Sequence, residues 1–129
     1  MTLKTDINSI SRSQLLKLNK ALTIACTERM GTSNPKIRTT NRTSSYYMGY
    51  YDIAENTIFI YRGMLDNVEE YVKVFIHEWT HSRQPKIFAE YDKAEAKYGY
   101  RNNPFEIEAR SSEKEYKSEI WKQVKKIMK

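Results

Sequence analysis

The chain has 129 residues, a formal net charge of +6 at pH 7 and a pI of about 9.3. Hydrophobic residues make up 40% and charged residues 29% of the chain, which is typical of a globular protein. Four glycines and three prolines argue against long flexible linkers, and there is no internal repeat or low-complexity segment. We therefore expect a single domain over residues 1–129, large enough to bury roughly two-thirds of its unfolded surface.

The single cysteine, Cys26, cannot form a disulfide within the chain. Its apolar neighbours predict a buried small side chain rather than a reactive thiol. The segment Met1–Asp6 lacks the apolar run of a signal peptide, and no stretch approaches the length of a membrane span. We expect a cytoplasmic protein without a membrane partner.

The first predicted helix covers residues 11–30. Ser11 and Gln14 have the spacing of a capping box, apolar residues follow at helical intervals, and Gly31 is a typical stop. Residues 1–10, before this helix, are predicted to be a flexible lead-in.

Three short strands are predicted next, because runs of threonine, tyrosine and isoleucine replace the helical period. They cover Lys36–Thr43, Tyr46–Tyr51 and Asn56–Tyr61, with a hairpin loop at residues 52–56. The pattern predicts a small, mostly antiparallel sheet. The strand Asn56–Tyr61 is expected to be an edge strand that can bind an extended peptide by main-chain pairing.

Four tyrosines occur close together in the second of these strands. Cross-strand packing is the favoured interpretation, ahead of a platform for stacking nucleic-acid bases. The four residues are Tyr46, Tyr47, Tyr50 and Tyr51.

The second long helix is expected to begin with Asp66 as N-cap and Glu69 at N3, and to end at Gln84, before Pro85. A short helix at 86–98 and a turn at Gly99 follow.

The last predicted helix covers 103–127, with Asn103 as N-cap, Pro104 at N1 and Glu106 at N3. The predicted fold class is therefore α+β and mainly helical, with about three strands packed against three to four helices.

The second long helix contains both histidines of the chain, in the sequence His77-Glu78-Trp79-Thr80-His81. Two histidines four residues apart lie on one face of a helix, where both can bind one zinc ion. The glutamate between them can reach a water molecule on the same metal. This pattern predicts a zinc site with Glu78 as general base.

A catalytic zinc site needs a third protein ligand. The metzincin pattern is excluded, because Gln84 and Ile87 stand where it needs glycine and histidine. A carboxylate on the last helix is therefore expected. Glu108 is favoured because Glu106 has a capping role at N3, and Glu106 is the second choice. The carboxylates further along are predicted to face solvent: Glu113, Glu115 and Glu119.

The His77–His81 motif, followed by Glu106-Ile107-Glu108-Ala109 on a later helix, resembles the gluzincin-type zinc metallopeptidases. It is most similar to the ImmA/IrrE-like and minigluzincin families, and the similarity covers roughly residues 56–116. The resemblance implies a zincin-like fold with Glu108 as the third ligand. Many relatives stabilise the transition state with a histidine or tyrosine. No spare histidine exists here, which leaves Tyr98, Tyr100 or Arg110.

The sequence thus predicts a zinc-dependent peptidase that hydrolyses a protein or peptide substrate. The alternative is a non-catalytic zinc-containing binding module. It would bind a protein partner, or nucleic acid through the basic end of the last helix, where lysines dominate: Lys117, Lys122, Lys125, Lys126 and Lys129.

Overall fold

A computed structural model describes residues 1–43 and 46–129. In chain order its elements are η1 (Ile7–Ser9), α1 (Arg12–Met30), β1 (Lys36–Thr40), β2 (Gly49–Asp52), β3 (Thr57–Tyr61), η2 (Arg62–Met64), α2 (Val68–Ser82), α3 (Ile87–Asn102) and α4 (Pro104–Ile127). The predicted α+β class, mainly helical with a small sheet, is confirmed. Among the described residues no helix has both the length and the apolar character needed to cross a membrane.

The sheet has the order β1-β3-β2 and is mixed. β3 pairs in parallel with β1 and antiparallel with β2, so the prediction of a mostly antiparallel sheet holds for one of the two pairings. The expectation that Asn56–Tyr61 forms an edge strand is wrong. β3 is central because Ile58 and Ile60 are fully buried between its two neighbours and the helices. The edge beside the histidines is β2.

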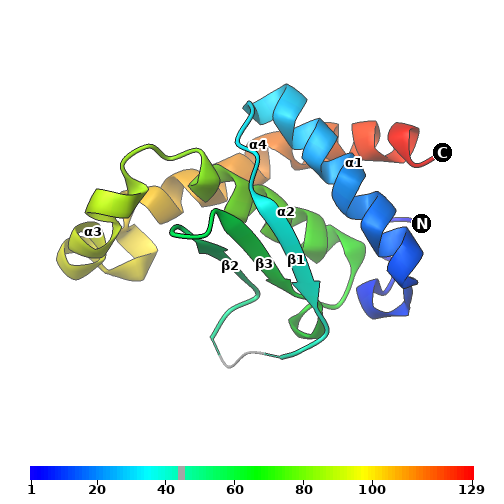
Figure 1. Cartoon of the computed structure of the whole chain (residues 1–129), viewed down its shortest axis with the longest axis horizontal. Helices are drawn as coiled ribbons and strands as arrows, with labels where there is room; N and C mark the ends of the chain where they lie inside the picture. The colour runs from blue at the N-terminus through cyan, green and yellow to red at the C-terminus, as the bar shows by residue number, and fades with distance from the viewer. Residues whose placement is uncertain (44–45) are drawn as a thin grey trace.

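One face of the sheet packs against α2, and α2 also contacts α1 and α4. α1 runs beside β1 (Figure 1), where the side chain of Asn19 donates to the hydroxyl of Thr39. The core joins Ile58 and Ile60 of β3 to apolar side chains of α1, α2 and α4. Phe75 and Trp79 stack within it at a centroid distance of 6.1 Å. Cys26 is fully buried, as predicted, and burial raises the pKa of its thiol. The helix that carries the histidines is therefore packed against β2, β3, α1 and α4.

Residues 1–10 are packed, and the prediction of a flexible lead-in is wrong. The side chain of Ile7 is fully buried, and its amide donates to the carbonyl of Asp66. The amide of Val68 in turn donates to the carbonyl of Thr5. The sequence did not reveal this packing, because the two buried isoleucines, Ile7 and Ile10, and three main-chain hydrogen bonds give no periodic pattern.

The predicted helix boundaries are close to those observed. Ser11 and Gln14 form the expected capping box of α1. α2 begins one residue later than predicted, because Asn67 rather than Asp66 is its N-cap and accepts from the amide of Glu70. It ends at Ser82, two residues before the predicted end. α3 contains a break at Gly99, where φ is 77°.

Candidate metal centre

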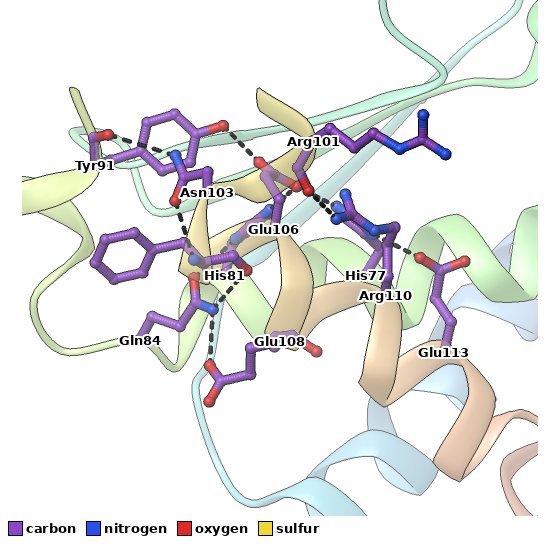
Figure 2. A network of polar contacts seen from close by, with 12 residues as sticks. His77, His81, Gln84, Tyr91, Arg101, Asn103, Glu106, Glu108, Arg110 and Glu113 are labelled. Atoms are coloured by element: carbon purple, nitrogen blue, oxygen red, sulfur yellow. Dashed lines mark hydrogen bonds and ion pairs between the residues drawn. The ribbon is translucent and has the colours of Figure 1, made fainter. Parts of the chain in front are cut away.

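Three side chains from two helices converge on one point. His77 and His81 stand one turn apart on α2, and Glu106 projects toward them from the first turn of α4 (Figure 2). Oε1 of Glu106 lies 2.8 Å from Nε2 of His77 and 3.1 Å from Nε2 of His81. The three possible ligand atoms lie within 4.8 Å of one another, so this group can hold a metal ion.

The structure places Glu106 in this group, where Glu108 was favoured from the sequence. Glu108 points away from the histidines, and its Oε1 accepts a 2.7 Å hydrogen bond from Nε2 of Gln84. Glu106 does not cap α4 with its side chain, because the Asn103 carboxamide caps the helix by accepting from the amide of Phe105. The supposed capping role that argued against Glu106 is therefore absent.

Each histidine is anchored through its second ring nitrogen. Nδ1 of His77 lies 2.7 Å from Oε2 of Glu113, and Nδ1 of His81 lies 2.8 Å from Oε1 of Gln84. Both rings are thereby turned so that Nε2 faces Glu106. Histidines that bind metals commonly donate the other ring N–H to a carboxylate or carbonyl oxygen. Glu113, predicted to face solvent, is one of these anchors.

The orientation of the Gln84 amide follows from its other partners. Its NH₂ group donates to the carbonyl of Phe105 at 3.0 Å and to the carboxylate of Glu108. Both partners are acceptors, so the amide oxygen must face His81 and accept from Nδ1. Glu108 thus acts on His81 only through Gln84.

The protonation of the two histidines follows from the same contacts. Burial by itself would lower the pKa of His77, but hydrogen bonds to Glu106 and Glu113 raise it to about 10. The pKa of His81 is also raised, against the effect of burial, by its contact with Glu106 and the charge of Glu78. The His77 ring therefore carries two protons at neutral pH, the contact with Glu106 favours the protonated form of His81 as well, and a metal ion would take the place of a proton on Nε2.

Glu106 is charged and has a third partner. Burial would raise its pKa, but the hydrogen bonds from His77 and His81 hold it well below the usual range. Its second oxygen, Oε2, accepts a 2.5 Å hydrogen bond from the hydroxyl of Tyr91 on α3. Burial and this contact raise the pKa of the Tyr91 phenol, so it remains a donor at neutral pH. The sequence reasoning did not identify Tyr91.

Glu78 lies between the histidines and is only 7% exposed. Burial raises the pKa of its carboxyl group above the usual value. Gly49 of β2 allows the strand to come close here: a Cβ at this position would lie 2.4 Å from Cγ1 of Val74 and 3.3 Å from Cγ of Glu78. The strand edge and the Glu78 carboxylate therefore share one cavity.

That cavity is a cleft of about 580 Å³ with the histidines, Glu78 and Glu106 at its base. One wall is β2 with the segment before it, and the other is α3. Tyr100 lines the cleft, whereas Tyr98 and Arg110 do not. Arg110 instead donates to the carbonyl of Arg101 (Figure 2). Of the three residues that the sequence analysis considered, Tyr98, Tyr100 and Arg110, Tyr100 alone lines the cleft.

The tyrosines near β2 pack against one another along the open side of the sheet. Ring centroids are 5.6 Å apart for Tyr47 and Tyr50, and 6.4 Å apart for Tyr50 and Phe59. Tyr50 and Phe59 are direct partners across β2 and β3, which agrees with the predicted cross-strand packing. Tyr46 and Tyr47 also line the cleft.

The basic end of α4 is partly engaged in ion pairs within the chain. Nζ of Lys117 lies 2.5 Å from Oε2 of Glu69 on α2, and Lys122 pairs with Glu119 on its own helix. Lys117 therefore links α4 to α2 through an ion pair.

No protein-family model matches the sequence, and the chain shows no significant similarity to a curated protein or to a solved structure. What the site can do must therefore be argued from its own geometry.

Proposed function

We propose that the protein is a zinc-dependent metallopeptidase. The observation that carries this proposal is the convergence of both Nε2 atoms on one oxygen of Glu106, with Glu78 beside them at the base of a cleft. Ion pairs that serve stability alone do not need two histidines with the same nitrogen presented to one point. They also do not need each ring fixed by a separate acceptor.

The donor set favours zinc. Two imidazole nitrogens and one carboxylate oxygen match the three-ligand catalytic zinc sites, which keep a fourth position open. A bound zinc ion would polarise the substrate carbonyl and lower the pKa of a water molecule. Glu106 would bind through Oε1, and Tyr91 would hold the other oxygen in place.

Glu78 is the proposed general base. It lines the cleft next to both histidines, where its carboxylate can take a proton from the attacking water. The pKa of its carboxyl group is raised toward neutral pH, so the protonated group can be held long enough to return the proton to the leaving amine nitrogen. Burial in the cleft wall keeps this carboxylate in one position between the two steps.

Tyr100 is the proposed donor to the oxygen of the substrate carbonyl. Burial, together with the charges of Glu106 and Glu78, raises the pKa of its phenol to about 12, so the group stays protonated. Tyr91 has a different part, because its hydroxyl is already committed to Glu106. We assign Tyr91 to positioning of the carboxylate.

β2 is the proposed docking strand for an extended peptide. Within the described part of the sheet, β3 is its one strand partner, so its other edge faces the cleft. Main-chain pairing there would lay a peptide across the histidines. The missing side chain at Gly49 leaves the backbone close to Glu78, where the peptide bond would have to lie.

The test compares Glu78→Gln with the parent protein on a mixture of unfolded protein substrates. Loss of cleavage with zinc content unchanged is expected, because the amide cannot accept the proton. Tyr100→Phe should lower the cleavage rate, whereas the matched control Tyr98→Phe should not. Cleavage by Glu78→Gln at the parental rate would refute the mechanism.

A further inference from the structure

The α3 wall of the cleft is acidic in a chain of net positive charge. Asp92 and Glu95 line this wall, and the cleft lining contains no lysine or arginine from the described residues. The remaining lining side chains are mainly aromatic and aliphatic, apart from those at the base. The α3 wall of the cleft is thus negatively charged, although the chain as a whole has a net charge of +6.

Glu95 has a carboxylate oxygen without a partner. Oε1 of Glu95 is buried and has no hydrogen bond from any residue the structure describes. A buried charged oxygen without a donor is unfavourable, and native proteins seldom keep one without a purpose. Glu95 also lines the cleft, so a cationic group bound there can pair with its carboxylate.

The cations nearest in sequence are directed elsewhere. Lys93 and Lys97 are each two residues from Glu95 on α3, and residues at that spacing do not face each other on a helix. Nζ of Lys97 lies 5.2 Å from the ring centroid of Tyr98. Arg110, whose charge reaches Tyr100, donates to the carbonyl of Arg101. Among the described residues no lysine, arginine or histidine forms an ion pair with Glu95.

Aromatic rings surround the same position. Tyr91 and Tyr100 line the cleft, and the charge of Glu95 contributes, after burial and Glu106, to the raised pKa values of both phenols. A cation next to Glu95 would thus also lie near tyrosine rings, whose faces attract ammonium and guanidinium groups. A carboxylate flanked by tyrosines is suited to a long cationic side chain with an apolar stem.

We infer that the cleft selects peptides with a lysine or arginine close to the cleaved bond, with Glu95 as the principal partner of that side chain and Asp92 as the secondary one. Glu95 lies four residues, about 6 Å along the helix axis, from Tyr91, which contacts Glu106. An extended peptide advances about 3.3 Å per residue, so the cation falls within about two residues of the cleaved bond. This inference rests on the proposed peptidase activity.

The experiment uses the zinc-loaded full chain and pooled peptides in which one fixed position holds lysine, norleucine or glutamate. Cleavage sites and rates are compared for the parent, Glu95→Gln and Glu95→Lys. Glu90→Gln is the control, because Glu90 is an exposed acidic residue of α3 outside the cleft. Loss of one charge-assisted contact corresponds to about a tenfold change.

The parent and Glu90→Gln should cleave the lysine pool about tenfold faster than the norleucine pool. Glu95→Gln should remove that difference, and Glu95→Lys should favour the glutamate pool. Equal cleavage of all three pools by the parent would overturn the inference and leave the peptidase intact. A lysine preference unchanged in Glu95→Gln would also overturn it.

A binding measurement separates the two claims if no pool is cleaved. Fluorescein-labelled peptides from the lysine and norleucine pools are titrated with Glu78→Gln, which is expected to keep zinc and bind without cutting. Tighter binding of the lysine peptides that is lost in the double variant Glu78→Gln/Glu95→Gln would uphold the cation site. Together with the absence of cleavage by the parent, it would refute the peptidase. Equal binding of both pools would refute the cation site.

Discussion

Nδ1 of His77 donates to Oε2 of Glu113 at 2.7 Å, although the two residues lie on different helices. Glu113 is two helical turns beyond Glu106, so both carboxylates approach His77 from the same face of α4, one at each ring nitrogen. The two contacts fix the orientation of the His77 ring, with Nε2 directed at Glu106. One face of α4 thus supplies both a candidate metal ligand, Glu106, and the carboxylate that orients His77, Glu113.

Glu113→Gln is expected to weaken zinc binding without abolishing it. Its amide can still accept from Nδ1, but it no longer supplies the negative charge that makes the ring more basic. Replacing such an anchor typically costs 10–100-fold in metal affinity. Competition with a chromophoric chelator measures this, with Glu115→Gln as the matched control on α4. An unchanged affinity in Glu113→Gln would show that the contact is incidental.

Zinc binding at pH 7 is expected to release protons and to tighten as the pH rises. The pKa of His77 is raised from 6.5 to about 10, so this ring is protonated before the metal binds, and the pKa of His81 is shifted in the same direction. Calorimetric titration in two non-coordinating buffers of different ionisation enthalpy counts the released protons. Absence of proton release would contradict the assigned protonation.

The same shift sets the pH dependence of stability in chelator-treated protein. A pKa that is higher in the folded than in the unfolded state stabilises the fold fully below the unfolded value, near 6.5, and loses this effect as the pH rises toward 10. Urea midpoints of the chelated protein should therefore fall between pH 6.5 and 10. A midpoint that rises over this window would contradict the prediction.

Gly49→Ala is expected to impair both stability and activity. The added methyl group would collide with Cγ1 of Val74, and relief requires β2 to move away from α2 and Glu78. Overpacking of this kind typically costs 1–3 kcal/mol. Urea denaturation checks the stability loss, and Gly63→Ala is a useful comparison because its added Cβ would clash outside the cleft, at the Asn41 carbonyl. Parental stability and cleavage in Gly49→Ala would argue against a tightly seated strand.

The helices and the motif were predictable because local signals specify them. The Ser11–Gln14 capping box, the apolar period of α2 and the Asn103-Pro104 start of α4 all depend on neighbours in sequence. The parallel pairing of β1 with β3 was not predictable, because it depends on how a connection crosses the sheet. The packing of Ile7 likewise depends on a segment far away in the chain.

The helical period of α4 contains a signal for Glu106 as the third candidate ligand. Glu106, Ala109, Glu113 and Tyr116 recur every three to four residues, which places both glutamates on the stripe of α4 that faces the other helices. Glu108 lies off that stripe. The N3 position of Glu106 is also typical of a capping box, but Asn103 caps the helix without the Glu106 side chain. Helical phase was therefore the better guide.

The most direct test of the proposed metal centre is zinc content by mass spectrometry in Glu106→Ala and Glu108→Ala, each prepared alongside the parent. Glu106 contacts both Nε2 atoms, whereas Glu108 contacts only Gln84. Glu106→Ala is therefore expected to lose zinc, and Glu108→Ala to retain close to one zinc per chain. Full zinc occupancy in Glu106→Ala, or zinc loss confined to Glu108→Ala, would contradict the proposed site.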